Sequence, residues 1–315
     1  MSTQIDHASE VFAEEVLQAF DDVGSEPGFR PAHAKGILLA GVFTPSPTAK
    51  SLTRAPHLQR PSTPVSVRFS DFAGIPTVPD NGPEASPRGF ATRFHLAEHV
   101  HTDIIGHSTD GFPARTVEEL VEFLRAIHAS GPGVNKPTPI EKFLATHPAA
   151  LEFVQAPKPM PVSFVKTSFY AVNAHKFTNA EGLTRYGRYR IRPEGNSEYL
   201  DPSAEAKAGP NFLFDEIKQR LAKGPAKMRI VVQLAAKEDI VNDSTVHWPA
   251  DRPEVDFGVL EIKSVIPNND AEQRQIIFDP IPRVDGLQPS EDPLLEPRAN
   301  VYLLSGRRRR AAIPK

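Results

Sequence analysis

Apolar residues recur three and four positions apart in several stretches of the chain, which predicts amphipathic helices. The clearest are residues 8–23 and 117–128, the second with Thr116 as a suitable N-cap. Shorter helices are expected over 139–154 and 211–222. The apolar positions of the first helix are Val11, Phe12, Val16, Leu17 and Phe20.

Elsewhere apolar and polar residues alternate between turn-forming residues, which is typical of β-strands. Residues 163–178 and 183–192 predict a β-hairpin that turns at 179–182, and 279–297 reads as a long connection rich in proline and aspartate. No repeat or composition break divides the chain, so we expect one α+β domain whose antiparallel sheet closes into a barrel. The remaining predicted strands are 65–70, 90–96, 228–235 and 257–266, of which the first two should be neighbours.

Composition narrows the class of protein without identifying its chemistry. The 315 residues carry a formal charge of −3, so no general positive field would attract nucleic acid or an anionic membrane. The 32 prolines favour long loops and argue against a helical bundle. Because the chain has no cysteine, disulfides, thiolate catalysis and Cys-type metal sites are excluded. Any redox chemistry would need a cofactor.

The start of the chain, MSTQIDHASEVF, lacks the basic stretch followed by an apolar one that marks a secretory signal. No window reaches the roughly 18 apolar residues of a membrane span. We therefore expect a cytoplasmic protein that binds neither membranes nor nucleic acid.

Two residues could take part in catalysis or in binding an anion, although each could also have an ordinary structural or solvated role. His33 stands beside cations in an apolar segment, where a single histidine is more often structural than catalytic. Arg68 lies on the face of its predicted strand opposite Val67 and Phe69. It needs an anion if that face is buried and none if the face is solvated.

Arg298 and Tyr302 are four residues apart, so on a helix the guanidinium would lie beside the phenol. A free tyrosine titrates near pH ~10, and a phenolate at neutral pH needs a positive neighbour or a metal ion. An ordinary pair on a helix surface is the alternative. Pro297 would disturb a helix interior, so the helix is expected to start there.

Histidines and arginines form two further clusters. His95, His99 and His101, with His107 close behind, could hold zinc or non-heme iron, but their spacing matches no established ligand scheme. They fall where a hairpin should turn, so solvated histidines are the favoured interpretation. The basic run 307–310 is expected to be a solvated tail rather than a nucleic-acid site, and one of its arginines could serve a carboxylate within the protein.

Taken together and in order, the short motifs of this sequence resemble the catalase family. Five or more such motifs in the right order are hard to obtain by chance. Because the chain stops soon after Tyr302, it resembles the compact catalase-related peroxidases rather than the large catalases. The motifs are R-x-x-H-A-K-G at 30–36, VRFS at 67–70, PRGFATRFH at 87–95, DIIG at 103–106, WP at 248–249, FDP at 278–280 and R-x-x-x-Y at 298–302.

The resemblance implies an antiparallel barrel of about eight strands with a heme b between the barrel and flanking helices. Residues 1–27 are then expected to form an N-terminal helical arm and residues 28–315 the heme-binding domain. By position, Tyr302 matches the axial ligand of the heme iron, the known pattern in catalase, and Arg298 would hold it as a phenolate.

The resemblance also implies roles for the other candidates. His33 matches the distal base that moves a proton between the two peroxide oxygens, and Ser70 matches the residue that orients its imidazole. His107 stands where catalases carry an asparagine that helps to bind the second peroxide, so cleavage of the oxygen–oxygen bond is expected but efficient dismutation is not. Three arginines match positions that pair with heme propionates, namely Arg30, Arg68 and Arg309.

These matches predict a heme peroxidase that reduces hydrogen peroxide or an organic hydroperoxide, oxidises a small organic donor and has weak catalase activity. A role in the response to oxidative stress and a small homo-oligomer are expected as well. One alternative is a fatty-acid hydroperoxide isomerase of the allene oxide synthase type. Others are a non-catalytic heme-binding protein and a metal protein built on the histidine cluster.

Overall fold

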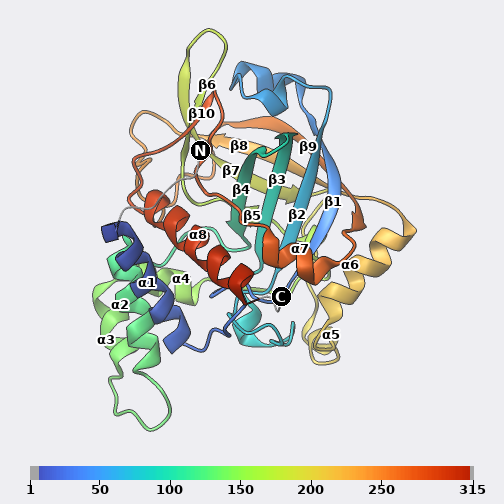
Figure 1. Cartoon of the computed structure of the whole chain (residues 1–315). Coiled ribbons are helices and arrows are strands. Elements are labelled where there is room, and N and C mark those ends of the chain that lie inside the picture. Colours follow the sequence, from blue (N-terminus) through green and yellow to red (C-terminus); the bar gives the residue numbers. More distant parts are fainter. Residues whose placement is uncertain (1–6, 313–315) are drawn as a thin grey trace.

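The computed structural model describes residues 7–312, in which an antiparallel β-barrel is flanked by helices (Figure 1). The strands are β1 Gly36–Pro45, β2 Thr63–Ser70, β3 Gly89–Ala97, β4 Val100–His107, β5 Phe169–Tyr170, β6 His175–Thr178, β7 Thr184–Pro193, β8 Ala226–Leu234, β9 Glu254–Val265 and β10 Leu287–Pro289. The α-helices are α1 His7–Asp22, α2 Val117–His128, α3 Pro139–Thr146, α4 Pro148–Gln155, α5 Pro202–Glu205, α6 Phe212–Lys223, α7 Asn269–Gln275 and α8 Leu295–Ala311. Short 3-10 helices cover Pro47–Ser51, Pro56–Leu58, Pro83–Ala85 and Phe164–Lys166.

Eight strands close the barrel in the order β7-β5-β4-β3-β2-β1-β9-β8, and β8 pairs with β7 again. All of these pairings are antiparallel. Strands β6 and β10 extend the sheet beside β7, and the β6–β7 hairpin projects beyond the barrel (Figure 1). The predicted closed antiparallel barrel is confirmed, as is the pairing of the strands predicted at 65–70 and 90–96.

The inside of the barrel is a continuous apolar core to which each of its eight strands contributes. Alternation along β2 shows how the sequence builds it, because Val65, Val67 and Phe69 point inward and are almost fully buried. Phe69 stacks on Phe164 with ring centroids 5.1 Å apart. The residues between them, including Arg68, take the outer face of the same strand. The outer face is therefore where polar groups are available.

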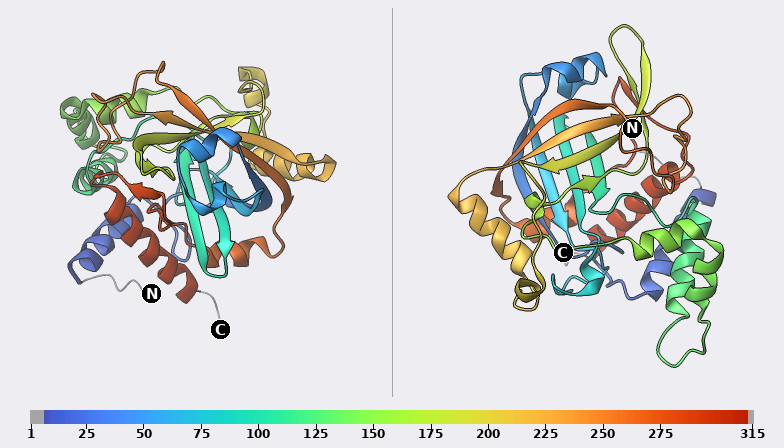
Figure 2. Two further views of the ribbon diagram at one scale, coloured as in Figure 1. Left: turned by 90° about the horizontal axis from the view of Figure 1, so that it is seen from above. Right: turned by 180° about the vertical axis from the view of Figure 1, so that it is seen from behind.

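Helices cover two sides of the barrel (Figures 1 and 2). Helices α1, α2 and α8 pack on one another through a second apolar cluster that includes Leu17, Leu124 and Leu304. Helix α6 lies on another side of the barrel (Figure 2). Among residues 7–312, no helix is both long and apolar enough to cross a membrane. The packing of α1 on α8 places the N-terminal helix against the segment that carries Tyr302.

Several predicted boundaries differ from the structure for physical reasons. The helix expected over 139–154 is two helices, because Pro148 has no N–H to continue α3 beyond His147. The expected first hairpin strand is broken into β5 and β6, which pair separately with β7. The connection expected over 279–297 contains β10 and the first turn of α8. Strand β1 was not predicted, because apolar residues on both faces hide its alternation.

Candidate active site

His33 lies between α1 and β1 in a left-handed backbone conformation with a φ of 61°. Such a conformation costs a residue with a side chain roughly 1–2 kcal/mol, so neighbouring structure must hold it. The N–H of His33 donates to the carbonyl of Phe72 at 2.6 Å, and that of Ala34 donates to Ala73 at 3.0 Å. The segment that follows β2 therefore fixes the turn that presents the imidazole.

The imidazole of His33 is oriented through its Nδ1 atom. This atom lies 3.1 Å from the carbonyl oxygen of Asp71 and 3.2 Å from Ser70 Oγ. Because a carbonyl oxygen only accepts hydrogen bonds, Nδ1 carries the proton and Nε2 is left as the basic nitrogen. Gly89 pairs with Ser70 across the sheet, and a Cβ there would lie 2.5 Å from His33 Nδ1. Only glycine leaves room for the ring at this position of the PRGF motif.

His107, at the end of β4, is a second imidazole near His33. Burial lowers the pKa of each to about 3. After burial, the positive charge of Arg68 and then His107 lower the pKa of His33 further. The positive charge of Arg298 does the same for the pKa of His107. His107 thus lowers the pKa of His33, and both histidines are neutral bases at neutral pH.

The ring of His107 has no polar anchor comparable to that of His33. Among the described residues, neither of its nitrogens has a hydrogen-bond partner within 3.5 Å. Two aromatic rings flank it, Phe153 with a centroid distance of 6.0 Å and Phe112 with one of 6.4 Å. Sequence reasoning missed both phenylalanines, because neither carries a signal that separates it from a core residue.

Three guanidinium groups from three separate segments converge beside these histidines. Arg30 and Arg309 both donate to the carbonyl of Ile276, at 3.1 and 3.2 Å. Arg68 donates to the carbonyl of His33 at 2.9 Å. Burial lowers the pKa of all three arginines, and their mutual repulsion lowers the pKa of Arg30 and Arg68 further.

A second glycine makes room for this arginine cluster. A Cβ on Gly36 would lie 2.2 Å from Arg68 Nη2, so the glycine of the R-x-x-H-A-K-G motif admits the guanidinium. Arg68 and Arg309 are each 4% exposed, so the solvated outer face considered for Arg68 is wrong. Within residues 7–312, the arginines of the cluster form no ion pair with a carboxylate within 4.0 Å. Buried cations without a partner fit a bound group that carries negative substituents.

Tyr302 and Arg298 lie on α8, four residues apart as the sequence predicts. Arg298 Nη2 donates to Tyr302 Oη at 3.1 Å, and the guanidinium carbon lies 5.5 Å from the centre of the phenol ring. The helix starts at Leu295 rather than at Pro297, which falls in the first turn, where its missing N–H leaves no hydrogen bond unmade. Tyr302 also raises the pKa of Arg30, so the phenol borders the arginine cluster.

Two residues that sequence reasoning did not assign hold Arg298 in place. Its Nη1 donates to Asn173 Oδ1, and Asn173 Nδ2 donates to Asp292 Oδ2 at 2.8 Å. The other oxygen of Asp292 accepts the N–H of Leu294 at 3.0 Å, just before α8. No local signal could have found this chain of contacts, because its members are 119 and 125 residues apart in the sequence.

The histidine cluster at 95–101 does not form a metal site. His95 and His101 face each other across the β3–β4 hairpin, but His99 lies at the exposed turn, and His95 bonds Ser66 at 2.9 Å. Among the described residues, no group of three or more histidine, cysteine, aspartate or glutamate side chains is placed to hold a metal ion. The interpretation as a hairpin turn is confirmed.

The basic run at 307–310 is not a solvated tail, because all four arginines lie in the last turns of α8. Arg308 pairs with Glu14 and, at 3.5 Å, with Asp21 of α1. Arg309 points inward to Ser305 and the arginine cluster. The tertiary contact between α8 and α1 supplies carboxylates that the local sequence does not show.

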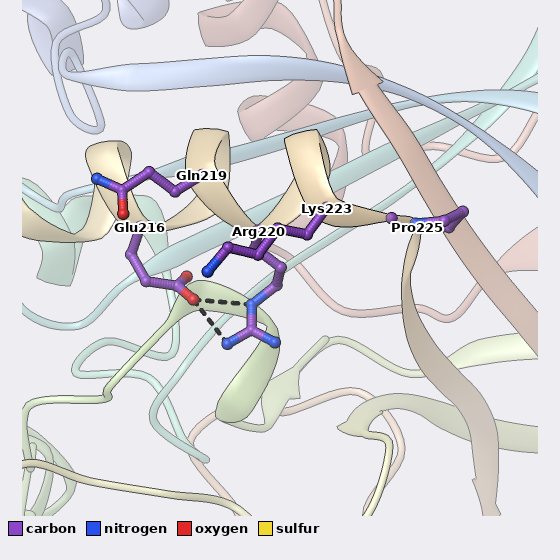
Figure 3. A pocket seen from close by; sticks show the side chains of 6 residues that line it. Glu216, Gln219, Arg220, Lys223 and Pro225 are labelled. Atoms are coloured by element: carbon purple, nitrogen blue, oxygen red, sulfur yellow. Dashed lines mark hydrogen bonds and ion pairs between the residues drawn. The ribbon is translucent and has the colours of Figure 1, made fainter.

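A surface hollow of about 490 Å³ runs along α6 and is separate from this site (Figure 3). It is lined by Glu216, Gln219, Arg220, Lys223, Gly224 and Pro225. Glu216 and Arg220 satisfy each other as an ion pair at 2.6 Å within the helix. None of the residues described above lines this hollow, so it contributes nothing to their chemistry.

The fold and site together define a class: a closed eight-stranded barrel whose outer face gathers a basic imidazole, buried arginines and an arginine-bonded tyrosine. A family model described as catalase matches residues 12–313. The chain belongs to the catalase family, whose members bind heme, and it is an oxidoreductase that acts on peroxide.

Two relatives resemble this chain over most of their length. A catalase-related peroxidase of Mycolicibacterium paratuberculosis is 32% identical over 295 residues, which are 91% of this chain and 92% of the relative. A catalase-related peroxidase of Synechococcus elongatus is 32% identical over 305 residues, 95% of this chain and 88% of the relative.

Solved structures of larger proteins share the fold. A fungal catalase and catalase A from Saccharomyces cerevisiae each superpose with a TM-score of 0.79 at 22% identity. The matches cover 90% of this chain but 59% and 62% of the two catalases.

Proposed function

We propose that this protein is a peroxidase that uses heme b to reduce hydrogen peroxide or an organic hydroperoxide at the expense of a small organic donor. The observation that carries the proposal is the convergence of His33, the arginine-bonded Tyr302, two buried arginines and the half-buried Arg30, none of the three arginines having a carboxylate partner among the described residues. Heme, when bound, supplies the iron through which electrons pass from the donor to the peroxide.

The arrangement of this chain suits the propionates and iron of such a group. Arg30, Arg68 and Arg309 would pair with the propionates, for which planar guanidinium groups are well shaped. The oxygen of Tyr302 would be the iron ligand, with the charge of Arg298 balancing an anionic oxygen. The contacts of Arg298 with Asn173, and of Asn173 with Asp292, fix that charge in place.

His33 would serve as general base and then general acid. Its Nδ1 proton is engaged with Asp71 and Ser70, so Nε2 is free to accept the proton of the peroxide and return it to the departing oxygen. Peroxide thereby takes up two electrons from the donor and two protons, and leaves as water or as water and an alcohol. The low pKa of His33, about 3, keeps this base unprotonated at neutral pH.

His107 would shape the specificity of the reaction. Among the described residues neither of its nitrogens has a hydrogen-bond partner within 3.5 Å, and at neutral pH the ring offers one donor and one acceptor where an asparagine offers an amide. The bulkier ring flanked by Phe112 and Phe153 leaves less room for a second peroxide. We therefore expect peroxidase activity with an external donor and weak catalase activity.

The test is the visible absorption spectrum of the purified full-length protein supplied with heme, recorded before and after peroxide. The proposal predicts a ferric, tyrosinate-type spectrum that changes with peroxide and returns when a phenolic donor is added. The His33→Ala variant should bind heme and react with peroxide about 100-fold or more slowly. The matched control is His57→Phe, which removes a buried histidine outside the site and should react at the wild-type rate.

Three outcomes would overturn parts of the proposal. Folded protein that takes up no heme would contradict the cofactor, and an unchanged rate in His33→Ala would contradict the base. Conversion of a fatty-acid hydroperoxide without consumption of a donor would show an isomerase instead. The cytoplasmic location, the small homo-oligomer and the link to oxidative stress remain predictions from the sequence.

A further inference from the structure

Directly behind His33 lies a largely buried network of four charged side chains to which the sequence analysis assigned no role. Asp71 and Asp80 are fully buried, and Arg88 is 2% exposed. Arg88 donates to Asp71 Oδ1 and, at 2.5 Å, to the carbonyl of Asp80. Lys35 donates to Asp80 Oδ1 at 2.5 Å and lies 4.0 Å from Asp71 Oδ2. Two positive and two negative groups thus balance each other in the interior.

Three of the four members are tied to rigid parts of the fold. Arg88 immediately precedes β3 and also donates to the carbonyl of Ala85 at 2.9 Å. Asp80 Oδ2 accepts the N–H of Leu213 at 2.8 Å, near the start of α6. Lys35 donates to the carbonyl of Pro210 at 2.7 Å. The network therefore anchors Asp71, which follows β2, to β3 and α6.

Asp71 connects this network to the imidazole. Its side chain is held by Arg88, its N–H donates to the carbonyl of Lys35 at 3.0 Å, and its own carbonyl oxygen lies 3.1 Å from His33 Nδ1. The next two residues accept the N–H groups of His33 and Ala34 and hold the left-handed turn. If the peptide of Asp71 moved, both the ring and the turn would lose their supports.

We propose that Asp71 is the positioning residue for the His33 base: its carboxylate, fixed by Arg88, holds the carbonyl that sets the imidazole tautomer. This inference rests on the proposed function of His33. Ser70 Oγ can donate or accept, so it cannot set the tautomer alone, whereas the Asp71 carbonyl can. The role differs from that of a direct proton carrier, because Asp71 contacts the ring through its carbonyl oxygen while its carboxylate is bound to Arg88.

The network also makes the position of the base sensitive to pH. Burial raises the pKa of Asp71 to about 7, and Arg88 opposes this shift. Below that pH the carboxyl is protonated and its ion pair with Arg88 is lost, so the peptide of Asp71 is held less firmly. The charged or titratable groups that face Asp71 are Arg88, Asp80, Lys35, Arg68 and His33.

The experiment compares the heme-loaded, full-length wild type with Asp71→Asn, which keeps the shape of the side chain and removes its charge. The rate constant for the reaction with hydrogen peroxide is measured between about pH 5 and pH 9. We expect Asp71→Asn to react about 10–100-fold more slowly at high pH, the usual effect of removing a group that orients a site residue. The wild-type rate should fall through about pH 7 toward that of the variant, because a protonated carboxyl resembles an amide.

The matched control is Asp239→Asn. Asp239 is another buried carboxylate, paired with Arg252 through contacts of 2.8 and 2.9 Å, in the connection between β8 and β9. A merely structural role of Asp71 predicts that both variants lower the melting temperature while the peroxide rate and its pH profile stay at wild-type values. That result would overturn the proposal.

Two additional measurements extend the test, and the first does not require Asp71→Asn to fold. Lys35→Met removes a positive charge near Asp71, so the step in the wild-type pH profile should move to higher pH; an unmoved step would overturn the proposal. A crystal structure of Asp71→Asn, where it folds, should show a lengthened contact between His33 Nδ1 and the carbonyl of residue 71, and an unchanged contact would contradict the role. A slow His33→Ala variant beside a fast Asp71→Asn variant would refute only this inference, whereas a fast His33→Ala variant would refute the proposed function.

Discussion

The two faces of strand β2 are equally buried but differ in how their side chains are satisfied. On the inner face, Val67 and Phe69 are completely buried and need only close packing. On the outer face, Arg68 and Ser70 are 4% and 3% exposed, and each needs polar partners. Hydrogen bonds to His33 meet part of this need, but the positive charge of Arg68 has no carboxylate partner among the described residues. Burial alone therefore does not separate core from site in this molecule, whereas unpaired buried charge does.

The largest expected effect is the loss of folding stability in acid, to which buried histidines both inside and outside the barrel contribute. Burial lowers the pKa of His57 inside the barrel, and of His33 and His107 outside it, to about 3, and that of His175 to about 4. The unfolded chain binds these protons near pH ~6.5, so stability is full above that pH and is lost as the pH falls toward 3. Asp71, whose pKa is raised in the folded chain, takes up a proton over much of the same pH range and so offsets the loss of stability due to one histidine.

We therefore expect the free energy of unfolding to fall by about 4 kcal/mol per pH unit below pH ~6. Denaturant titrations of the full chain at several pH values check this slope. The His57→Phe variant should reduce the slope by about 1.4 kcal/mol per pH unit, because one titrating group is removed. Equal stabilities at pH 7 and pH 5 would contradict the prediction.

The next effect isolates the inner face of β2. Phe69→Ala leaves a cavity beside Phe164 and Phe169 and should lower the free energy of unfolding by about 3–5 kcal/mol. Chemical denaturation measures this change. Val11→Ala, on a side chain that is 56% exposed, is the control and should change stability by less than ~0.5 kcal/mol. A loss as small for Phe69 as for Val11 would show that the barrel core is loosely packed.

A smaller effect tests the positive charge of the arginine cluster, which has no carboxylate partner among the described residues. Arg309→Met removes one cation of the cluster and should weaken heme binding by about 10-fold, equivalent to ~1.4 kcal/mol, as measured by the rate of heme transfer to an acceptor protein. Its neighbour Arg308, paired with Glu14 at the surface, supplies the control. Arg308→Met should leave heme binding unchanged. Equal loss in both variants would point to helix α8 in general rather than to the cluster.

The smallest effect concerns the outer face one residue before Asp71. Ser70→Ala removes one hydrogen bond of His33 and leaves the Asp71 carbonyl, so the peroxide rate should fall only about 3–10-fold, consistent with ~1 kcal/mol. Ser66→Ala lies on the same face and removes a bond to His95. Stopped-flow measurements should give the wild-type rate for Ser66→Ala. A larger loss in Ser70→Ala than in Asp71→Asn would assign the orientation of His33 to the hydroxyl.

The sequence by itself determined much of this protein. Alternation predicted β2, β3 and β9, because one face of each strand must meet an apolar core. Helical spacing predicted α1, α2 and α6 for the same reason. The i, i+4 contact of Arg298 and Tyr302 is local geometry, so it was also predicted and is confirmed. The ordered motifs indicated the catalase family, and the family model confirms it.

The tertiary structure alone decided how the candidate residues meet. Whether Arg68 faces water or protein depends on α7, whose Gln273 accepts from Arg68 Nε at 2.8 Å across 205 residues of sequence. The burial of Arg309 depends on where α8 packs against the segment at Ile276, and the surface pairing of Arg308 depends on where α1 packs. The network that joins Asp71 to Asp80, Arg88 and Lys35 has no local pattern, because its geometry arises from segments brought together only when the barrel closes. Pairing of buried charges is a long-range property, and sequence periodicity reports only which face of an element is covered.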